Sequence, residues 1–267
     1  MPDMKETLRR KKLFLLDMDG TLYLDDHVFD HCLDFLNAVK KQGGKYLYIT
    51  NNSSKSVDKY VEKMNRIRIP AKNDEFFTST DAACVYLKNN YHGKKIYALG
   101  TASFRQQLKN AGFPITDQLE DDIDCLLMGF DTELTFKKLE DACILLGRGV
   151  EYLATNPDWV CPTAYGFVPD CGSVSQMLFN ATKRMPYFIG KPEPAMALLA
   201  IEKAGCKPED AVLIGDRIYT DIACGVNAGI TTVLVFSGET TREDWEKSDI
   251  KPTYTCQDIA EIFELIR

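Results

Sequence analysis

Short apolar runs alternate along this chain with longer stretches whose apolar residues recur at helical spacing. The runs that predict strands are 13–16, 46–50, 211–214 and 231–236. The residues that predict the first intervening helix are Val28, Cys32, Phe35, Leu36 and Val39, with Gly43 placed to end it. Strands that alternate with helices predict a parallel sheet covered by helices, which is the α/β class.

The middle of the chain has an alternation of its own. Strands are predicted at 95–99, 125–128 and 151–155, and helices at 103–111, 136–146 and 173–182. We interpret residues 81–182 as a second α/β unit inserted into the first. Residues 1–80 plus 183–267 then form a Rossmann-like parallel-sheet core, whose sheet is predicted to resume near Tyr187.

Polar residues stand at the ends of three predicted strands or just after them. Asp17 follows Leu16, Thr50 ends the next strand, and Asp216 comes just after Ile214 and Gly215. Ligand sites in open α/β sheets lie at the carboxyl ends of the strands. These side chains are therefore expected at one edge of one sheet.

Two acidic groups carry the sharpest chemical signal. Asp17 and Asp19 stand two apart in the run Asp-Met-Asp-Gly-Thr-Leu, and Asp216 and Asp221 follow another strand. A solvated turn or an acidic helix start would explain either group alone. A calcium loop starting at Asp17 would need glycine at its sixth and glutamate at its twelfth position, which this chain lacks. Together the carboxylates predict a divalent cation, and hard oxygen ligands favour Mg²⁺.

Positive and polar groups complement these carboxylates. Lys191 lies between Gly190 and Pro192, which constrain the backbone, although a lone lysine is usually a surface residue. Thr50, Asn51 and Asn52 stand between a strand and a helix. They suit a helix cap and equally a phosphate site at a helix N-terminus.

Composition narrows the class of protein. The 267 residues carry a formal net charge of −7, which argues against a general nucleic-acid surface. The N-terminal apolar run of four residues is too short for a signal peptide or a membrane helix. The nine cysteines include no CxxC pair and suit free thiols in a reducing compartment. We expect a cytoplasmic protein with no membrane or nucleic-acid partner.

These motifs, in this order, resemble those of the haloacid dehalogenase superfamily. The Ile-Thr-Asn-Asn form at 49–52 and the insertion before Lys191 resemble its NagD and p-nitrophenylphosphatase-like branch. The resemblance implies a phosphatase in which Asp17 forms an aspartyl phosphate. Asp19 would then be the general acid and base, which also favours phosphoryl transfer over dehalogenation, because halide leaves without a proton.

The resemblance also implies the remaining roles. The phosphate would be held by Thr50, Asn51, Asn52 and Lys191, with Lys191 also pairing with Asp17. Mg²⁺ would be bound by the side chains of Asp17 and Asp216 and the backbone carbonyl of Asp19, with Asp221 in support.

The inserted unit would be a cap that closes over the site and selects the substrate. Its loops at Asn156 and Asp158 and at Gly172 and Ser173 resemble the branch's substrate loops, although ordinary capping would explain them too. The substrate would be a small phosphorylated metabolite of unspecified class. Caps of this branch often carry dimer contacts, so a homodimer stays open. Two alternatives also stay open: a phosphotransferase such as a phosphomutase, and a non-catalytic relative that binds phosphorylated ligand.

Overall fold

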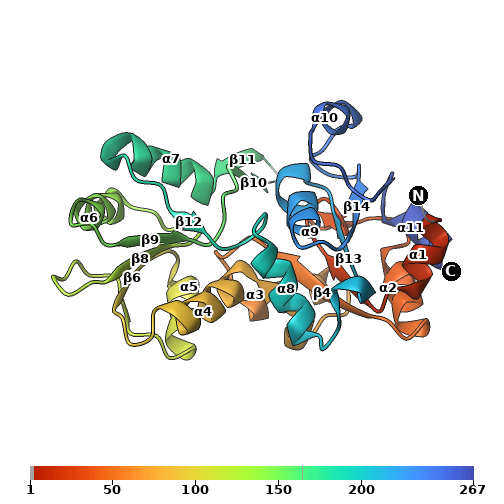
Figure 1. The fold of residues 1–267 in the computed structure, drawn as a ribbon, viewed down its shortest axis with the longest axis horizontal. Coiled ribbons are helices and arrows are strands. Elements are labelled where there is room, and N and C mark those ends of the chain that lie inside the picture. Colours follow the sequence, from red (N-terminus) through yellow and green to blue (C-terminus); the bar gives the residue numbers. More distant parts are fainter. Residues whose placement is uncertain (1–2, 164) are drawn as a thin grey trace. The chain divides into compact units, whose positions relative to one another are not determined.

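The chain forms two compact units in the computed structural model, which describes residues 3–163 and 165–267 (Figure 1). The first unit comprises Met1–Thr50, Val61–Phe77 and Lys191–Arg267, and the second comprises Asn51–Tyr60 and Thr78–Gly190. The second unit therefore includes residues 51–60, 78–80 and 183–190, which lie outside the predicted insertion at 81–182. The division into a catalytic core and a cap at those boundaries stays a prediction.

The first unit is built on a sheet with the strand order β15-β14-β13-β1-β4-β5 in the described part of the chain. Its elements, with α3 and β5 crossing its boundary, are α1 (Met4–Arg10), β1 (Leu13–Leu16), β2 (Tyr23–Leu24), β3 (His27–Val28), α2 (Cys32–Lys41), β4 (Lys45–Thr50), α3 (Val57–Arg66), η1 (Asn73–Glu75), β5 (Phe76–Thr78), α8 (Pro194–Lys203), η2 (Pro208–Asp210), β13 (Ala211–Gly215), η3 (Ile218–Ile222), α9 (Ala223–Asn227), β14 (Thr231–Val235), α10 (Arg242–Lys247), β15 (Tyr254–Cys256) and α11 (Ile259–Ile266).

Strand β1 lies at the centre of this sheet and pairs in parallel with β13 on one side and β4 on the other. All four of its residues are fully buried, as expected for an apolar strand covered on both faces. Helix α8 contacts β1, and α2 contacts β4. The predicted strand at 13–16 is confirmed. The predicted first helix starts later than expected, at Cys32, because Val28 pairs with Tyr23 in the β2–β3 hairpin.

The second unit has its own sheet, with the strand order β12-β9-β8-β6-β7 in the described residues. Its elements are α4 (Ser79–Asn90), β6 (Ile96–Leu99), α5 (Ala102–Asn110), β7 (Ile115–Thr116), β8 (Cys125–Met128), α6 (Phe136–Gly147), β9 (Glu151–Ala154), β10 (Val160–Thr163), β11 (Gly166–Pro169), α7 (Cys171–Thr182) and β12 (Tyr187–Phe188). Buried side chains of α6 and α7, among them Leu145 and Leu178, pack with Leu126 and Met128 of β8.

The prediction that the core sheet resumes near Tyr187 is wrong. Tyr187 and Phe188 pair in parallel with Leu153 and Ala154, so β12 belongs to the sheet of the second unit. The backbone N–H of Ile189 continues this pairing by donating to Ala154. The core sheet resumes at β13. The predicted fold class, a parallel-sheet α/β core with an inserted α/β unit, is confirmed.

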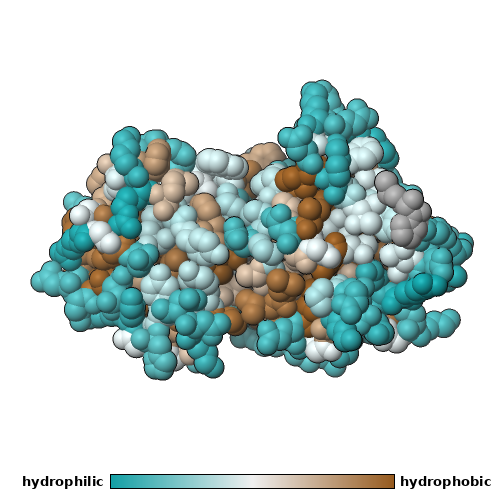
Figure 2. Space-filling view, in the orientation of Figure 1, coloured by the Kyte–Doolittle hydropathy of each residue, from teal (hydrophilic) through white to brown (hydrophobic). Residues whose placement is uncertain are grey.

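The polarity of the surface agrees with the content of charged residues in the chain. Helix α10 presents mainly hydrophilic residues on the face drawn in Figure 2. Among the described residues, the helices are too short or too polar for any of them to cross a membrane.

Candidate active site

The sheet register brings the predicted polar residues of the first unit to one edge. Leu16 lies beside Ile214 of β13 and Tyr48 of β4, so the next residues, Asp17 and Gly215, are neighbours. The N–H of Asp17 donates to the carbonyl of Ile214 at 2.9 Å, which fixes the chain just beyond the strand. The predicted convergence of strand ends therefore follows from three adjacent parallel strands.

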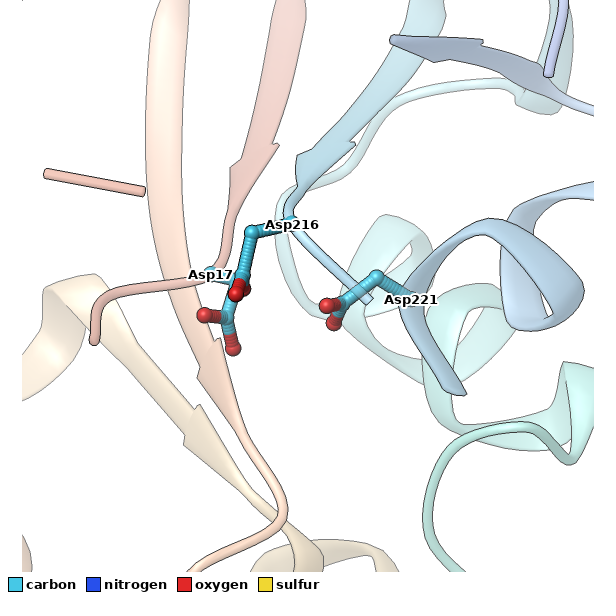
Figure 3. Close-up of side chains that lie close together, drawn as sticks. All are labelled: Asp17, Asp216 and Asp221. Atoms are coloured by element: carbon cyan, nitrogen blue, oxygen red, sulfur yellow. The ribbon is translucent and has the colours of Figure 1, made fainter. Parts of the chain in front are cut away.

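Three carboxylates meet at this edge, as Figure 3 shows. Asp17, Asp216 and Asp221 each offer one oxygen, and these oxygens all lie within 4.8 Å of one another. Asp221 belongs to the π-helical turn η3, and its side chain packs on Gly215, where a Cβ would approach the Asp221 Cγ to 2.4 Å. Glycine at 215 thus allows the cluster to form.

Lys191 supplies a positive charge within this cluster. Its Nζ donates to Asp17 Oδ1 at 2.7 Å, to Asp221 Oδ1 at 2.5 Å and to the carbonyl of Ile49 at 3.4 Å. The residue is only 2% exposed and precedes Pro192 through a cis peptide bond. Burial lowers the pKa of the Lys191 ammonium, but Asp17 and Asp221 outweigh burial and raise that pKa above its usual value. Lys191 is therefore a buried cation.

One ammonium does not neutralise three carboxylates, and the titration of the cluster reflects this. Burial, reinforced by Asp221, raises the pKa of Asp17 well above its usual value, although Lys191 acts in the opposite direction. Burial and Asp221 likewise raise the pKa of Asp216 to about 7, opposed by Arg217. The metal-free cluster thus retains protons that a divalent cation would displace.

Asp216 is held so that one of its oxygens stays available. Its Oδ2 accepts the backbone N–H of Glu239 at 2.7 Å. Its Oδ1 is buried and has no hydrogen-bond partner among the described residues. The backbone of Gly20 and Gly238 packs against this carboxyl, where a Cβ would lie within 2.5 Å of Oδ2. Gly20 also has φ +87°, a left-handed conformation that favours glycine. A buried, unpaired carboxylate oxygen in an anionic cluster fits a hard divalent cation such as Mg²⁺.

Asp19 does not join this carboxylate cluster through its side chain. Its Oδ1 accepts from Lys63 Nζ at 3.2 Å, and its side chain is 41% exposed. The chain turns directly after Asp17, because the N–H groups of Thr21 and Leu22 both donate to the carbonyl of Met18. The two aspartates of the motif therefore have different surroundings.

The predicted phosphate-binding residues lie at and beyond the end of β4. Thr50 ends the strand in the first unit and is buried. Asn51 and Asn52 belong to the second unit. The Asn51 amide donates to Asp158 Oδ2 at 2.7 Å, and Asn52 Oδ1 accepts from the N–H and hydroxyl of Ser54 at 3.0 and 2.7 Å.

Two of the predicted substrate-loop residues lie inside the second unit. Asn156 is fully buried, and its Nδ2 donates to Asp158 Oδ2 at 2.7 Å and to Asp170 Oδ1 at 3.1 Å. Asp158 is 2% exposed and accepts from both Asn51 and Asn156. This network holds the Asn51 amide in place. A role for Asn156 and Asp158 in substrate selection stays a prediction.

The other predicted loop residues begin helix α7. Gly172 donates its N–H to the carbonyl of Asp158 at 2.8 Å, and a Cβ at this position would lie 2.2 Å from the carbonyl of Pro157. The hydroxyl of Ser173 donates to the carbonyl of Trp159 at 2.5 Å. Both residues tie the start of α7 to the preceding loop, and their substrate role also stays a prediction.

Sequence reasoning missed Lys63 and Gly238. Lys63 contacts Asp19 from helix α3, and Gly238 packs against Asp216. Neither position stands out locally, because a lysine on an amphipathic helix and a glycine in a polar loop are common. Their importance depends on contacts between residues 44 and 22 positions apart.

Comparison with known proteins identifies the family. A family described as haloacid dehalogenase-like hydrolase matches residues 14–114, and a second described as HAD-hydrolase-like matches residues 188–262. The chain is 33% identical to an acid sugar phosphatase from Staphylococcus aureus (strain MRSA252), over 95% of this chain and 97% of that protein.

Solved structures agree with the sequence comparison. A 4-nitrophenylphosphatase from Thermotoga maritima superposes with a TM-score of 0.92 at 36% identity, over 98% of this chain and 99% of that one. A glycerol phosphate phosphatase from Mycobacterium tuberculosis, solved in complex with magnesium, gives a TM-score of 0.90 at 25% identity, over 96% of this chain and 77% of that one. The chain belongs to the haloacid dehalogenase-like hydrolases, in the branch of NagD and the p-nitrophenylphosphatases, as its motifs predicted.

Proposed function

We propose that this chain is a Mg²⁺-dependent phosphatase that hydrolyses a small phosphate monoester through an aspartyl phosphate on Asp17. The observation that carries the proposal is the buried cluster in which Lys191 contacts Asp17 and Asp221 beside an unpaired oxygen of Asp216. Phosphatase names among the sequence and structural relatives support the same class of reaction.

In the first step an oxygen of Asp17 attacks phosphorus, and the bond from phosphorus to the leaving oxygen breaks. A carboxylate is a modest nucleophile, so position and charge must supply most of the rate. Lys191 holds Asp17 Oδ1 and places its positive charge beside the group that gains the phosphoryl charge.

Asp19 completes both steps by moving a proton. Its protonated carboxyl donates the proton to the departing alkoxide, so the alcohol leaves neutral. The resulting carboxylate then takes a proton from the water that attacks phosphorus. That attack breaks the bond between phosphorus and Asp17, which regenerates the Asp17 carboxylate and releases inorganic phosphate.

Mg²⁺ would be held by the side chains of Asp17 and Asp216 and by the backbone carbonyl of Asp19, with Asp221 supporting Lys191 and the site. When bound, Mg²⁺ supplies positive charge that screens Asp17 from the incoming phosphate and stabilises the transferring phosphoryl group.

Substrate binding is proposed to use residues beyond β4 as well. Thr50, Asn51 and Asn52, with Lys191, would hold the phosphoryl oxygens. Residues 81–182 would act as the cap, with Asn156, Asp158, Gly172 and Ser173 in the loops that select the substrate. Acid sugar phosphatase and glycerol phosphate phosphatase are names of relatives, and they suggest a small phosphorylated metabolite. The cytoplasmic setting expected from the sequence stays a prediction.

A direct test compares hydrolysis of p-nitrophenyl phosphate in Mg²⁺ and in EDTA, for the wild type and for Asp17→Asn. We expect turnover in Mg²⁺ and a loss of several orders of magnitude in EDTA or in the variant. Near-full activity of Asp17→Asn would overturn the nucleophile assignment. Transfer of phosphate to a sugar hydroxyl in place of water would indicate a phosphotransferase. Binding of phosphorylated ligand without any turnover would indicate a non-catalytic relative.

A further inference from the structure

Helix α3 presents two cations to the loop and hairpin that follow Asp17. Lys63 Nζ lies 3.2 Å from Asp19 Oδ1, and one turn later Arg66 forms a bidentate pair with Asp26 at 2.5 and 2.8 Å. The two pairs differ in exposure. The side chains of Arg66 and Asp26 are 62% and 57% exposed, whereas that of Lys63 is only 21% exposed.

Lys63 is fixed from a second direction by an aromatic ring. Its Nζ lies 4.1 Å from the ring centroid of Tyr23, which is fully buried, so the contact is a cation–π interaction. Tyr23 is itself tied to the motif, because its carbonyl accepts the N–H of Gly20 at 2.8 Å. Lys63, Tyr23 and the backbone after Asp19 therefore form one connected arrangement.

This arrangement distinguishes the two oxygens of Asp19. Among the described residues, Oδ1 has Lys63 as its hydrogen-bond partner and Oδ2 has none. An ammonium group donates hydrogen bonds and cannot accept them. A proton that Asp19 transfers must therefore reside on Oδ2, while Lys63 holds Oδ1.

We propose that Lys63 is a positioning residue for Asp19: it holds Oδ1 so that Oδ2 faces the leaving oxygen, and it compensates the carboxylate formed when the proton departs. The inference rests on the proposed role of Asp19 as general acid. Lys63 lies outside the sequence motifs. Its contact with Asp19, which joins α3 to the loop after β1, then has a role in proton transfer as well as in the fold.

Lys63→Met tests this proposal, with Arg66→Met as the matched control on the same helix. The readout is kcat/KM for p-nitrophenyl phosphate and for phenyl phosphate, because kcat/KM reports the steps up to release of the phenol. Phenolate is the poorer leaving group and depends more on proton donation. For Lys63→Met we expect a loss of roughly 10- to 100-fold on phenyl phosphate and a clearly smaller loss on p-nitrophenyl phosphate. Arg66→Met should stay within about twofold of the wild type on both.

Two further variants separate positioning from a structural role. Lys63→Arg should recover most of the lost activity, because it retains a cationic donor. In an Asp19→Asn background, adding Lys63→Met should cost no more than about a further twofold on phenyl phosphate, since the group that it positions is already absent. Far-ultraviolet circular dichroism and the melting temperature check that both methionine variants fold.

The outcomes are distinct. Equal losses on both substrates, or a full further loss in the Asp19→Asn background, would show that Lys63 acts by binding substrate or by stabilising the fold, and would overturn the proposal. Wild-type rates for Asp19→Asn alone would instead show that Asp19 is not the general acid, and this part of the proposed function would then be wrong.

Discussion

Replacing Lys191 by methionine removes the ammonium group that donates to Asp17, Asp221 and the carbonyl of Ile49, while keeping a side chain of similar length. Without Mg²⁺, three clustered carboxylates then remain in a buried site. Lys191 and Asp221 have side chains that are only 3% and 1% exposed, so water cannot replace the lost partner.

The expected cost follows from this burial. Removing one partner of a buried ion pair typically destabilises a protein by about 3–5 kcal/mol, because the other charge is left uncompensated. For domains of this size the melting temperature should fall by roughly 10 °C. The loss should shrink near pH 5, because burial raises the pKa of Asp17 and Asp216, which lets both carboxyls take up protons in the folded state.

The assay is urea unfolding in EDTA at pH 8 and pH 5, in a Trp159→Phe background. This background leaves Trp245, which packs against Phe236 in the first unit, as the fluorescent reporter. Lys12→Met is the matched control. Lys12 pairs with Asp210 at 3.2 Å but is 67% exposed, so its loss should cost below about 1 kcal/mol. A Lys191→Met protein within about 1 kcal/mol of the wild type at pH 8 would refute the view that this lysine neutralises a buried anionic cluster.

Three further outcomes are expected. Mg²⁺ should raise the melting temperature more at pH 8 than at pH 5.5. Because the pKa of Asp216 in the metal-free folded protein is raised to about 7, ionisation of this carboxyl destabilises the folded state as the pH rises. Bound Mg²⁺ would remove this destabilisation, which is greater at pH 8. An equal rise at both pH values, or one that persists in Asp216→Asn, would contradict the ligand assignment. Gly20→Ala should weaken Mg²⁺ binding about tenfold or more by calorimetry, since a Cβ would lie 2.5 Å from Asp216 Oδ2; unchanged binding would count against the proposed packing. Asp158→Leu should raise KM for p-nitrophenyl phosphate by roughly tenfold, because Asp158 accepts a hydrogen bond from the Asn51 amide. The control is Asp141→Leu, which replaces another buried aspartate of the second unit and should leave KM unchanged.

The sequence predicted the parts of the molecule that local pattern determines. The apolar runs at 13–16 and 125–128 form β1 and β8 with those bounds, and the residues after β1 and β13 meet because parallel neighbours share an edge. Asp17, Asp216 and Lys191 could be predicted because Asp17 follows an apolar run directly and each of the other two follows one after a single glycine.

Other features depend on contacts that no local pattern encodes. Strand β12 joins the sheet of the second unit because Ile189 and Gly190 donate to residues 35 positions earlier, and a three-residue apolar run does not reveal which sheet it joins. The separation of Asp19 from Asp17 depends on a turn at Met18 and on Lys63 of α3. Burial of Asn156 and Asp158 is likewise invisible in a polar loop sequence.

Trapping the covalent intermediate tests the central claim most directly. Asp19→Asn should still transfer phosphate from p-nitrophenyl phosphate, whose leaving group needs little protonation, but should hydrolyse the aspartyl phosphate slowly. After acid quench and borohydride reduction, mass spectrometry should find homoserine at position 17, dependent on Mg²⁺ and absent when Asp17 is replaced by asparagine. An active enzyme that yields no modification at Asp17, or a modification at another residue, would contradict the account.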